Sequence, residues 1–491
     1  MAPIGVALLA LATRRASPWQ GAILGLVSGL ACFLPLLSWS GIYVGALPWI
    51  ALAVLESCYI ALLGLACALL QRGPSLAGVG RVRPLVVALA WVAQEALRSA
   101  TPFGGFPWGR LAFSQADSPL AGLAALGGAP AVTFGVALVG GLLAAGVAEL
   151  TRGSGQPGIQ HRGMVRSVLS AAPSLVGAIV LVALPVLVPR PTDGPTGRFL
   201  AVQGNVPRAG LDFNAERRAV LDNHARATRQ VAASVAAGAQ PRPDLLVWPE
   251  NASDVDPTRN PDAAVVIQES VDAINAPLIL GALLEEPAPK ASNTSLMYLP
   301  GEGVTQRYVK QHPVPFAEYM PYRSFFRTFS DKVDLLRTDF AAGKGAGVFR
   351  VPAQSGGTIA AGAIICFEVA YDALMRDTVD HGANVLLVQT NNATFGFTDE
   401  SVQQLAISRI RAIEHGRSIV HVSTVGVSAM ITPDGTAHQR SALFTSATLA
   451  ADLPLRTDRT VADRLGAWPE YVACGGLAVM LVLLGWRRLR R

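Results

Sequence analysis

The sequence has few charged residues for its length. Only 15% of its 491 residues are charged, whereas 51% are hydrophobic, and the mean hydropathy is +0.38. A soluble domain normally carries about 25% charged residues, so this balance excludes a wholly soluble protein. The basic residues behind the formal charge of +6 are scattered beside apolar runs, which excludes nucleic acid as a partner. We therefore expect a protein of the lipid bilayer that also has a polar part.

Cysteine is scarce in the polar part of the chain. Four of the five cysteines lie in long hydrophobic stretches, and only Cys366 lies outside them. It has no partner there for a disulfide and no neighbouring cysteine for a metal, so we expect no metal site and no cofactor. Cys366 follows the apolar run 358–365, which has the composition of a buried strand. At this position a nucleophile and an ordinary packed core cysteine are the alternatives.

Long apolar runs divide the rest of the chain. They cover residues 20–39, 45–70, 84–97, 130–148, 170–188 and 470–486, and a shorter run, 3–13, precedes them. A spanning helix needs about 20 apolar residues, so we expect an α-helical membrane bundle of about seven spans, the first one short. Residues 1–192 and 466–491 would form this bundle with a basic cytoplasmic tail. Residues 193–460 would form a separate domain.

Arginines accumulate in every second loop between the apolar runs. Positively charged loops remain in the cytoplasm, so this alternation predicts a multi-pass protein of the inner (cytoplasmic) membrane. It places residues 193–460 on the extracytoplasmic side. It also places Met1 outside, which leads us to expect that one membrane helix upstream is missing from this version of the chain or was lost in evolution.

Strand-like and helical segments alternate within residues 193–460. The strand-like runs are 199–206, 244–250, 278–282, 294–300, 358–368 and 384–390, and the helical segments are 211–237, 260–274, 370–381 and 399–416. This alternation predicts a layered α/β domain with buried sheets.

Three chemically active residues lie at the ends of these strands. Glu250 ends one strand, Lys310 directly follows another, and Cys366 ends a third. We expect neighbouring strand ends to bring them into one pocket. The chain has four lysines among its 40 basic residues, so a lysine in this place suggests that a compact ammonium group is required.

The segment 101–115 combines proline and glycine with aromatic residues. The prolines and glycines prevent a regular helix, whereas Phe106 and Trp108 are suited to the membrane interface. An interfacial anchor and a lipid-binding lid are equally good explanations. Glu95 and Arg98, three residues apart on the preceding helix, are expected to pair.

Three motifs resemble one known superfamily. VWPEN around Glu250, YVKQHPVPFAEYMP around Lys310 and ICFEVAYD around Cys366 resemble the carbon–nitrogen hydrolase (nitrilase) superfamily. With the membrane spans, the chain is similar to its membrane-embedded branch, the apolipoprotein N-acyltransferases. The resemblance implies a nitrilase-like α-β-β-α sandwich with a Glu-Lys-Cys triad. It also implies a phospholipid acyl donor and, as acceptor, the amino terminus of a diacylglyceryl-cysteine lipoprotein.

The resemblance assigns a role to each residue of the triad. Glu250 would take the proton of Cys366 as the thiol attacks the phospholipid ester. Lys310 and the backbone N–H of Phe367 would hold the oxyanion. The acyl chain would then pass from a cysteine thioester to the amine, with ping-pong kinetics.

Supporting residues and departures from the family pattern follow from the same motifs. Glu318 matches a carboxylate that orients the lysine and the amine, and Glu368 matches a polar position beside the cysteine. Phe367 replaces a frequent tyrosine, and Thr394 replaces a frequent tryptophan of the lid that also contains Phe395. The lid is therefore expected to differ in this chain.

Two other functions remain open from the sequence. A membrane-tethered amidase or nitrilase would use the same triad and pass the acyl group to water. A non-catalytic membrane partner of a polyprenol-dependent glycosyltransferase would need no triad at all.

Overall fold

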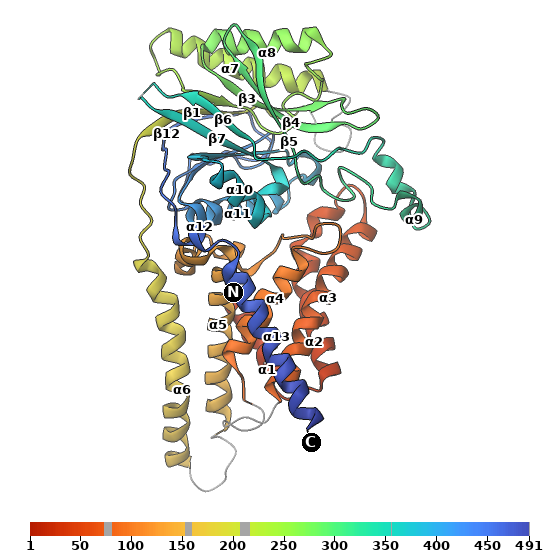
Figure 1. Ribbon diagram of the computed structural model, residues 1–491, viewed down its shortest axis with the longest axis vertical. Helices are drawn as coiled ribbons and strands as arrows, with labels where there is room; N and C mark the ends of the chain where they lie inside the picture. Colours follow the sequence, from red (N-terminus) through yellow and green to blue (C-terminus); the bar gives the residue numbers. More distant parts are fainter. Residues whose placement is uncertain (73–80, 153–159, 207–216, 355, 491) are drawn as a thin grey trace. The chain divides into compact units, whose positions relative to one another are not determined.

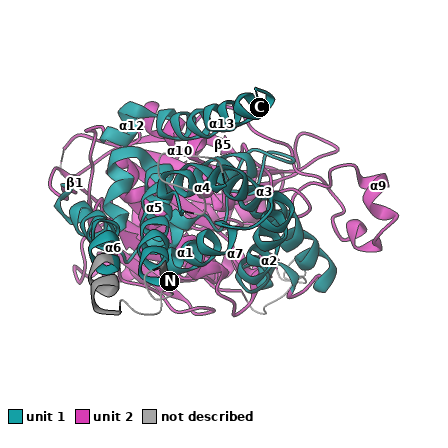
Figure 2. Ribbon diagram, turned by 90° about the horizontal axis from the view of Figure 1, so that it is seen from below, with its two compact units in different colours: residues 1–41, 45–189, 460–491 teal, residues 42–44, 190–459 magenta. Residues whose placement is uncertain are grey.

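The computed structural model describes residues 1–72, 81–152, 160–206, 217–354 and 356–490 (Figure 1). They form two compact units, drawn in different colours in Figure 2. The first unit consists of residues 1–41, 45–189 and 460 onward, and the second of residues 42–44 and 190–459. The long apolar runs lie in the first unit and the strand-rich part of the sequence lies in the second.

The first unit is helical. Its α-helices are α1 (Ala2–Thr13), α2 (Pro18–Leu36), α3 (Ala46–Gln71), α4 (Pro84–Arg98), α5 (Ala124–Arg152), α6 (Gln160–Ala183), α12 (Val461–Leu465) and α13 (Trp468–Leu489). In the described part of the chain, five helical stretches are long and apolar enough to cross a membrane: 18–36, 46–71, 119–151, 167–187 and 468–489. The predicted membrane bundle is confirmed, although α1 and α4, with 12 and 15 residues, are shorter than a full span.

Close packing of α2 against α3 depends on glycine. Ser17 caps the first turn of α2, and Gly21, Gly25 and Gly29 then recur every four residues on its buried face. A Cβ atom on Gly25 would lie only 2.2 Å from the carbonyl oxygen of Ile60 on α3. The two backbones therefore approach too closely for any side chain, as in other small-residue contacts between membrane helices.

The ion pair predicted between Glu95 and Arg98 is wrong. Nη1 of Arg98 lies 3.1 Å from Oε2 of Glu56, and Nε of Arg110 lies 3.2 Å from Oε2 of Glu95. All four side chains are at most 2% exposed. A buried charge needs a well-aligned partner, and α3 and the 101–115 segment offer better geometry than the next turn of the same helix.

Two six-stranded sheets form the core of the second unit (Figure 1). The first sheet has the order β12-β1-β2-β3-β4-β5 and the second β11-β10-β9-β8-β7-β6. The strands are β1 (Thr196–Gln203), β2 (Leu245–Val247), β3 (Leu278–Leu284), β4 (Ser292–Leu299), β5 (Gly303–Val309), β6 (Val348–Pro352), β7 (Thr358–Ile365), β8 (Val385–Thr390), β9 (Ser418–Ser423), β10 (Ala429–Ile431), β11 (Ala437–His438) and β12 (Ala447–Pro454). Strands β1 to β3 and β7 to β9 run parallel at the centres of the sheets.

Helices cover the outer face of each sheet. Helices α7 (Arg217–Ala236) and α8 (Pro261–Ile274) lie on the first sheet, and α10 (Asp372–Asp380) and α11 (Glu400–His415) lie on the second (Figure 1). Residues 211–216 of the helix predicted over 211–237 lie outside the described residues.

The side chains of β1 show how the layers are joined. Phe199 points into a core shared by both sheets, which also contains Ile365 and Leu387 of the second sheet. Its neighbour Leu200 points the other way, into the core formed with α7 and α8. Strand residues alternate between faces, so an apolar strand buried on both sides fits between these layers. The predicted α-β-β-α sandwich is confirmed.

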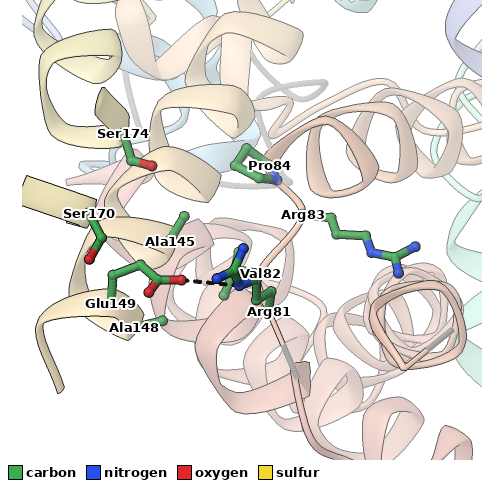
Figure 3. A pocket seen from close by; sticks show the side chains of 9 residues that line it. All are labelled: Arg81, Val82, Arg83, Pro84, Ala145, Ala148, Glu149, Ser170 and Ser174. Carbon is green, nitrogen blue, oxygen red and sulfur yellow. Dashed lines mark ion pairs between the residues drawn. The ribbon is translucent and has the colours of Figure 1, made fainter. Parts of the chain in front are cut away.

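A cavity of about 280 Å³ lies in the first unit (Figure 3). It is lined by residues 81–84, which lead into α4, and by side chains of α5 and α6. Arg81 and Glu149 form an ion pair at its edge, with 3.5 Å between Nε and Oε1. None of the candidate triad residues belongs to this unit.

Candidate active site

The three triad candidates come from both sheets of the second unit. Glu250 lies three residues after β2 and Lys310 directly after β5, both in the first sheet, whereas Cys366 directly follows β7 in the second. The expectation that they end neighbouring strands is wrong, because β3 and β4 lie between β2 and β5 in the first sheet, and Cys366 follows a strand of the second sheet. The site is formed where the two sheets face one another.

Cys366 sits on a sharp turn between β7 and a 3₁₀ helix, Cys366–Ala370. Its φ angle is +54°, a left-handed conformation that non-glycine residues rarely adopt. Strained backbone of this kind is common at functional sites. Burial, reinforced by the charge of Glu250, raises the pKa of the Cys366 thiol. The resting sulfur therefore carries its proton and requires a base.

Lys310 is held between two carboxylates. Its Nζ lies 3.2 Å from Oε1 of Glu250 and 2.9 Å from Oε1 of Glu318. The amide of Asn293 donates to the same two oxygens, at 2.7 and 3.0 Å. Lys310 is 1% exposed and Glu250 is 5% exposed. The group is thus an almost completely buried cluster of two carboxylates and one ammonium.

The electrostatics of this cluster favour proton transfer to Glu250. Burial raises the pKa of Glu250, the ammonium of Lys310 opposes that rise, and the charge of Glu318 adds to it. Burial lowers the pKa of Lys310, but the charges of Glu318 and Glu250 outweigh burial and hold it well above its ordinary value. Lys310 therefore stays protonated while Glu250 becomes a stronger base.

The second oxygen of Glu250 is fixed by the facing sheet. Oε2 accepts the backbone N–H of Asn391 at 2.8 Å, and the hydroxyl of Thr424 donates to the main-chain carbonyl of Glu250 at 2.9 Å. Gln389 on β8 donates to the carbonyl of Trp248 at 2.6 Å. These bonds connect the two sheets next to the base and fix its orientation toward the site.

Glu368 connects the cysteine turn to the loop after Lys310. Its Oε2 accepts the N–H of Ile365 at 2.8 Å, and its Oε1 accepts the N–H groups of Gln311 and His312 at 2.7 and 3.2 Å. The hydroxyl of Tyr308 donates to both oxygens. Glu368 is fully buried, and burial raises its pKa to about 7. Its carboxyl group thus positions both the nucleophile and the lysine.

The remaining predicted residues lie in different surroundings. Phe367 is buried and packs edge-on against Tyr371, with ring centroids 5.6 Å apart. In the first unit, Phe106 is half-buried, whereas Trp108 is buried and packs edge-on against Trp39 at 5.8 Å. Arg98 donates to the carbonyls of Phe106 and Trp108, so this loop is tied down within the bundle.

The lid loop of the second unit is more exposed at its end than at its centre. Phe395 is half-buried, whereas Phe397 is 74% exposed and its ring lies 4.3 Å from that of Phe444. The rings of Phe395 and Phe397 both belong to the loop Thr394 to Phe397, which the family resemblance predicts as the lid.

The second unit carries an aromatic arm that the sequence did not predict. It comprises residues 316–335, includes α9 (Arg323–Arg327), and extends beyond the ends of the strands in Figure 1. Its exposed apolar side chains are Phe316, Tyr322, Phe325, Phe329 and Leu335. Three of its ring pairs lie 4.9 to 5.2 Å apart. The signal in the sequence was the aromatic-rich run RSFFRTF inside a polar domain.

Three contacts of the site also went unnoticed in the sequence. They involve Asn293, described above, and two side chains that donate to the sulfur, Thr390 and Gln404. None belongs to a recognised motif, so no signal identified them. Among the described residues, no group of three or more His, Cys, Asp or Glu side chains is arranged to hold a metal ion.

Comparisons with known proteins cover nearly the whole chain. Residues 1–142 match the apolipoprotein N-acyltransferase N-terminal domain, and residues 201–463 match the carbon-nitrogen hydrolase family. An apolipoprotein N-acyltransferase from Mycolicibacterium smegmatis is 40% identical over 494 residues, covering 98% of this chain and 80% of the relative. One from Ralstonia nicotianae is 30% identical over 507 residues, covering 99% and 89%.

Solved structures similar to the chain include an amidase from Nesterenkonia sp. It is 16% identical and covers 54% of this chain and 93% of the amidase, with a TM-score of 0.37. The two matched domains occur in one chain, and the Mycolicibacterium relative is similar over 98% of this chain. The chain therefore belongs to the apolipoprotein N-acyltransferase family, a membrane branch of the carbon–nitrogen hydrolases.

Proposed function

We propose that the acyl transfer of this family runs through a thioester on Cys366. The sulfur attacks the ester carbonyl carbon of a phospholipid while Glu250 accepts the thiol proton. The carbonyl electron pair moves onto oxygen, and Lys310 Nζ and the backbone N–H of Phe367 donate to this oxyanion. The ester C–O bond then breaks, the leaving oxygen takes the proton from Glu250, and a lysophospholipid departs.

The second half of the reaction reuses the same groups. The amino group of the diacylglyceryl-cysteine attacks the thioester carbonyl, and Glu250 accepts its proton. The C–S bond breaks, and the sulfur recovers a proton from Glu250. Glu318, hydrogen-bonded to Lys310 at 2.9 Å, keeps the ammonium directed at the oxyanion in both halves. The protein needs no cofactor for these steps.

The observation that carries this proposal is the Glu250–Lys310–Glu318 cluster beside the thiol. The charges of Glu250 and Lys310 both act on the pKa of Cys366, so the thiol and the cluster share one electrostatic environment. A protonated thiol, a carboxylate with a raised pKa and a permanently charged lysine are the protonation states that acylation requires.

The aromatic arm supports a lipid as the acyl donor. Exposed Phe325 and Phe329 lie on the same unit as Cys366, next to Arg323 and Arg327, which pair with Asp339 and Asp334. Aromatic rings with flanking arginines suit the headgroup layer of a bilayer. We propose that the arm contacts the outer surface of the cytoplasmic membrane, because the arginine alternation predicts an extracytoplasmic second unit.

The deciding experiment incubates the purified chain with phospholipid vesicles and a diacylglyceryl lipopeptide. Mass spectrometry of the lipopeptide should show one added amide-linked acyl chain, and the Cys366→Ala variant should add none. With phospholipid alone, the wild type should carry one acyl chain on Cys366. Release of free fatty acid without acylated lipopeptide would favour the amidase alternative. No acylation of either Cys366 or the lipopeptide would favour the non-catalytic partner.

A further inference from the structure

We propose that Gln404 is a further catalytic residue, which donates a hydrogen bond to the thiolate of Cys366. This inference rests on the proposed role of Cys366 as the nucleophile. Nε2 of Gln404 lies 3.6 Å from Sγ, and Oγ1 of Thr390 lies 3.4 Å from it. Both distances are within the usual range for hydrogen bonds to sulfur. Gln404 lies on α11 and is fully buried.

The direction of the hydrogen bonds follows from a chain of contacts that begins far from the sulfur. The N–H of Gly426 donates to Oγ of Ser423 at 2.7 Å. The hydroxyl of Ser423 directs its own hydrogen to Oδ1 of Asn392, 2.5 Å away. This contact fixes which end of the Asn392 amide is oxygen. Its Nδ2 must then point to the opposite side.

Asn392 passes this orientation on to Gln404. One N–H of Nδ2 donates to Oε2 of Glu400 at 2.6 Å, and the other donates to Oε1 of Gln404 at 3.0 Å. Because Oε1 of Gln404 faces Asn392, its Nε2 must face Cys366. The sulfur is thus presented with a donor, which stabilises a thiolate more than a neutral thiol.

Thr390 suits both protonation states of the sulfur. Its hydroxyl also lies 2.8 Å from Oε1 of Gln404. When the sulfur is a thiol, Thr390 directs its hydrogen to Gln404 and accepts the S–H. When the sulfur is a thiolate, the hydroxyl rotates and donates to Sγ. Gln404 has no such freedom, because Asn392 fixes its amide.

A neutral donor at the sulfur offsets the unfavourable surroundings of a Cys366 thiolate. Glu250 and Glu400 both disfavour a thiolate, Lys310 favours it, and burial disfavours it most. Lys310 is also assigned to the oxyanion in the proposed mechanism. Gln404 and Thr390 are neutral donors that remain at the sulfur in both half-reactions. They stabilise the nucleophile as it loses its proton and the leaving sulfur when the amine displaces it.

The first test compares Gln404→Met with the wild type in the full-length protein. Methionine keeps the volume and removes the donor. The rate of Cys366 alkylation by iodoacetamide is measured at fixed pH by peptide mass spectrometry, together with the thermal unfolding temperature. A hydrogen bond to a charged group changes the thiolate fraction about ten- to a hundredfold. A thiolate of higher pKa is also more nucleophilic, which offsets part of this loss. The rate of Cys366 alkylation should therefore fall about three- to tenfold in Gln404→Met.

Gln403→Met is the matched control. Gln403 is the adjacent glutamine on α11 and is half-exposed, so the same chemical change is made one position away. Its alkylation rate should equal that of the wild type. A rate for Gln404→Met that is also within twofold of the wild type overturns the proposal, whatever its unfolding temperature.

A second test reverses the amide without removing it. The double variant Asn392→Asp, Glu400→Gln exchanges an acid and an amide, so the net charge and the volume stay nearly constant. The new carboxylate at position 392 has no N–H for Gln404, whose amide turns its nitrogen toward that carboxylate and its oxygen toward Cys366. Alkylation should slow at least as much as in Gln404→Met. An unchanged rate contradicts the orienting role of Asn392.

These readouts separate the inference from the proposed function. Alkylation reports on the thiol whether or not a phospholipid is ever used. If Cys366 responds to Gln404→Met but the wild type forms no acyl-enzyme, the thiolate contact stands and the acyl-transfer proposal fails. If the wild type forms an acyl-enzyme at a rate that Gln404→Met leaves unchanged, the inference fails and the proposed function stands.

Discussion

Lys310 and Glu318 hold one another at 2.9 Å, and Glu250 shares the same ammonium at 3.2 Å. Two acids around one lysine leave the cluster with a net negative charge when all three groups are ionised. That charge keeps Lys310 protonated and, together with burial, makes Glu250 readier to accept a proton. The site is therefore prepared for proton transfer before substrate arrives.

Replacing the lysine should block formation of the oxyanion while leaving the thiol in place. In Lys310→Met, the oxyanion loses its charged donor, so acyl-enzyme formation should fall about a hundred- to a thousandfold. The measurement is mass spectrometry of the Cys366 peptide after incubation with phospholipid alone. Iodoacetamide should still modify Cys366 in this variant, which shows that the site is folded. Acyl-enzyme formation at the wild-type rate would remove Lys310 from the mechanism.

The rate of acyl-enzyme formation should fall in acid because Glu250 must be ionised to act as the base. Burial raises its pKa above the ordinary value of 4.5, so the acid limb should lie above pH 4.5. Below that limb Glu250 keeps its proton and cannot accept one from Cys366. Glu250→Gln should lower the rate about a hundred- to ten-thousandfold and abolish the limb. An acid limb that persists unchanged in Glu250→Gln would assign it to another group.

The sequence predicted the two-part architecture and the sandwich well, because apolar length and strand alternation depend on local composition. Strand ends and motifs also selected Glu250, Lys310 and Cys366 as candidates, which the fold brings to the same region of the second unit. The sequence did not predict that Cys366 faces the other two across separate sheets, since pairing between sheets depends on long-range packing.

Contacts made by single polar side chains were the least predictable. Helical spacing suggested a Glu95–Arg98 pair, but Arg98 forms an ion pair with Glu56 on another helix. Gln404 belongs to none of the motifs and lies 38 residues after Cys366. Only the fold reveals that its amide reaches the sulfur. A sequence shows which groups are available, whereas their partners depend on the register of strands and the rotation of helices.

The aromatic arm should matter for membrane-bound donors and not for soluble ones. In the double variant Phe325→Ser, Phe329→Ser, two exposed rings lose their affinity for the headgroup layer. Burying one large apolar side chain contributes about 1.5–3 kcal/mol, so acylation from vesicles should slow at least about tenfold. Acylation from a water-soluble short-chain ester should not change.

Val265→Ser is the control for the arm. Val265 lies on α8 and is 53% exposed, so its replacement also removes exposed apolar surface from the second unit. Acylation from the vesicles and from the soluble ester should both proceed at the wild-type rate in this variant. Equal losses with the vesicle and the soluble donor in the Phe325→Ser, Phe329→Ser variant would indicate damage to the site and exclude a membrane role for the arm.

Glu368 should be essential for the position of the nucleophile, because every hydrogen-bond partner of its two oxygens is a donor. In Glu368→Gln, one oxygen becomes an NH₂ group that must face either the N–H of Ile365 or those of Gln311 and His312. A buried donor left facing a donor costs about 1–3 kcal/mol, which should lower the unfolding temperature. Ile365 directly precedes Cys366, so acyl-enzyme formation should fall as well.

Tyr308→Phe removes one hydroxyl donor and leaves every backbone N–H satisfied, so it should cost less stability and retain most of the activity. If Tyr308→Phe instead lost as much acyl-enzyme formation as Glu368→Gln, the backbone contacts of Glu368 would not be what positions the cysteine.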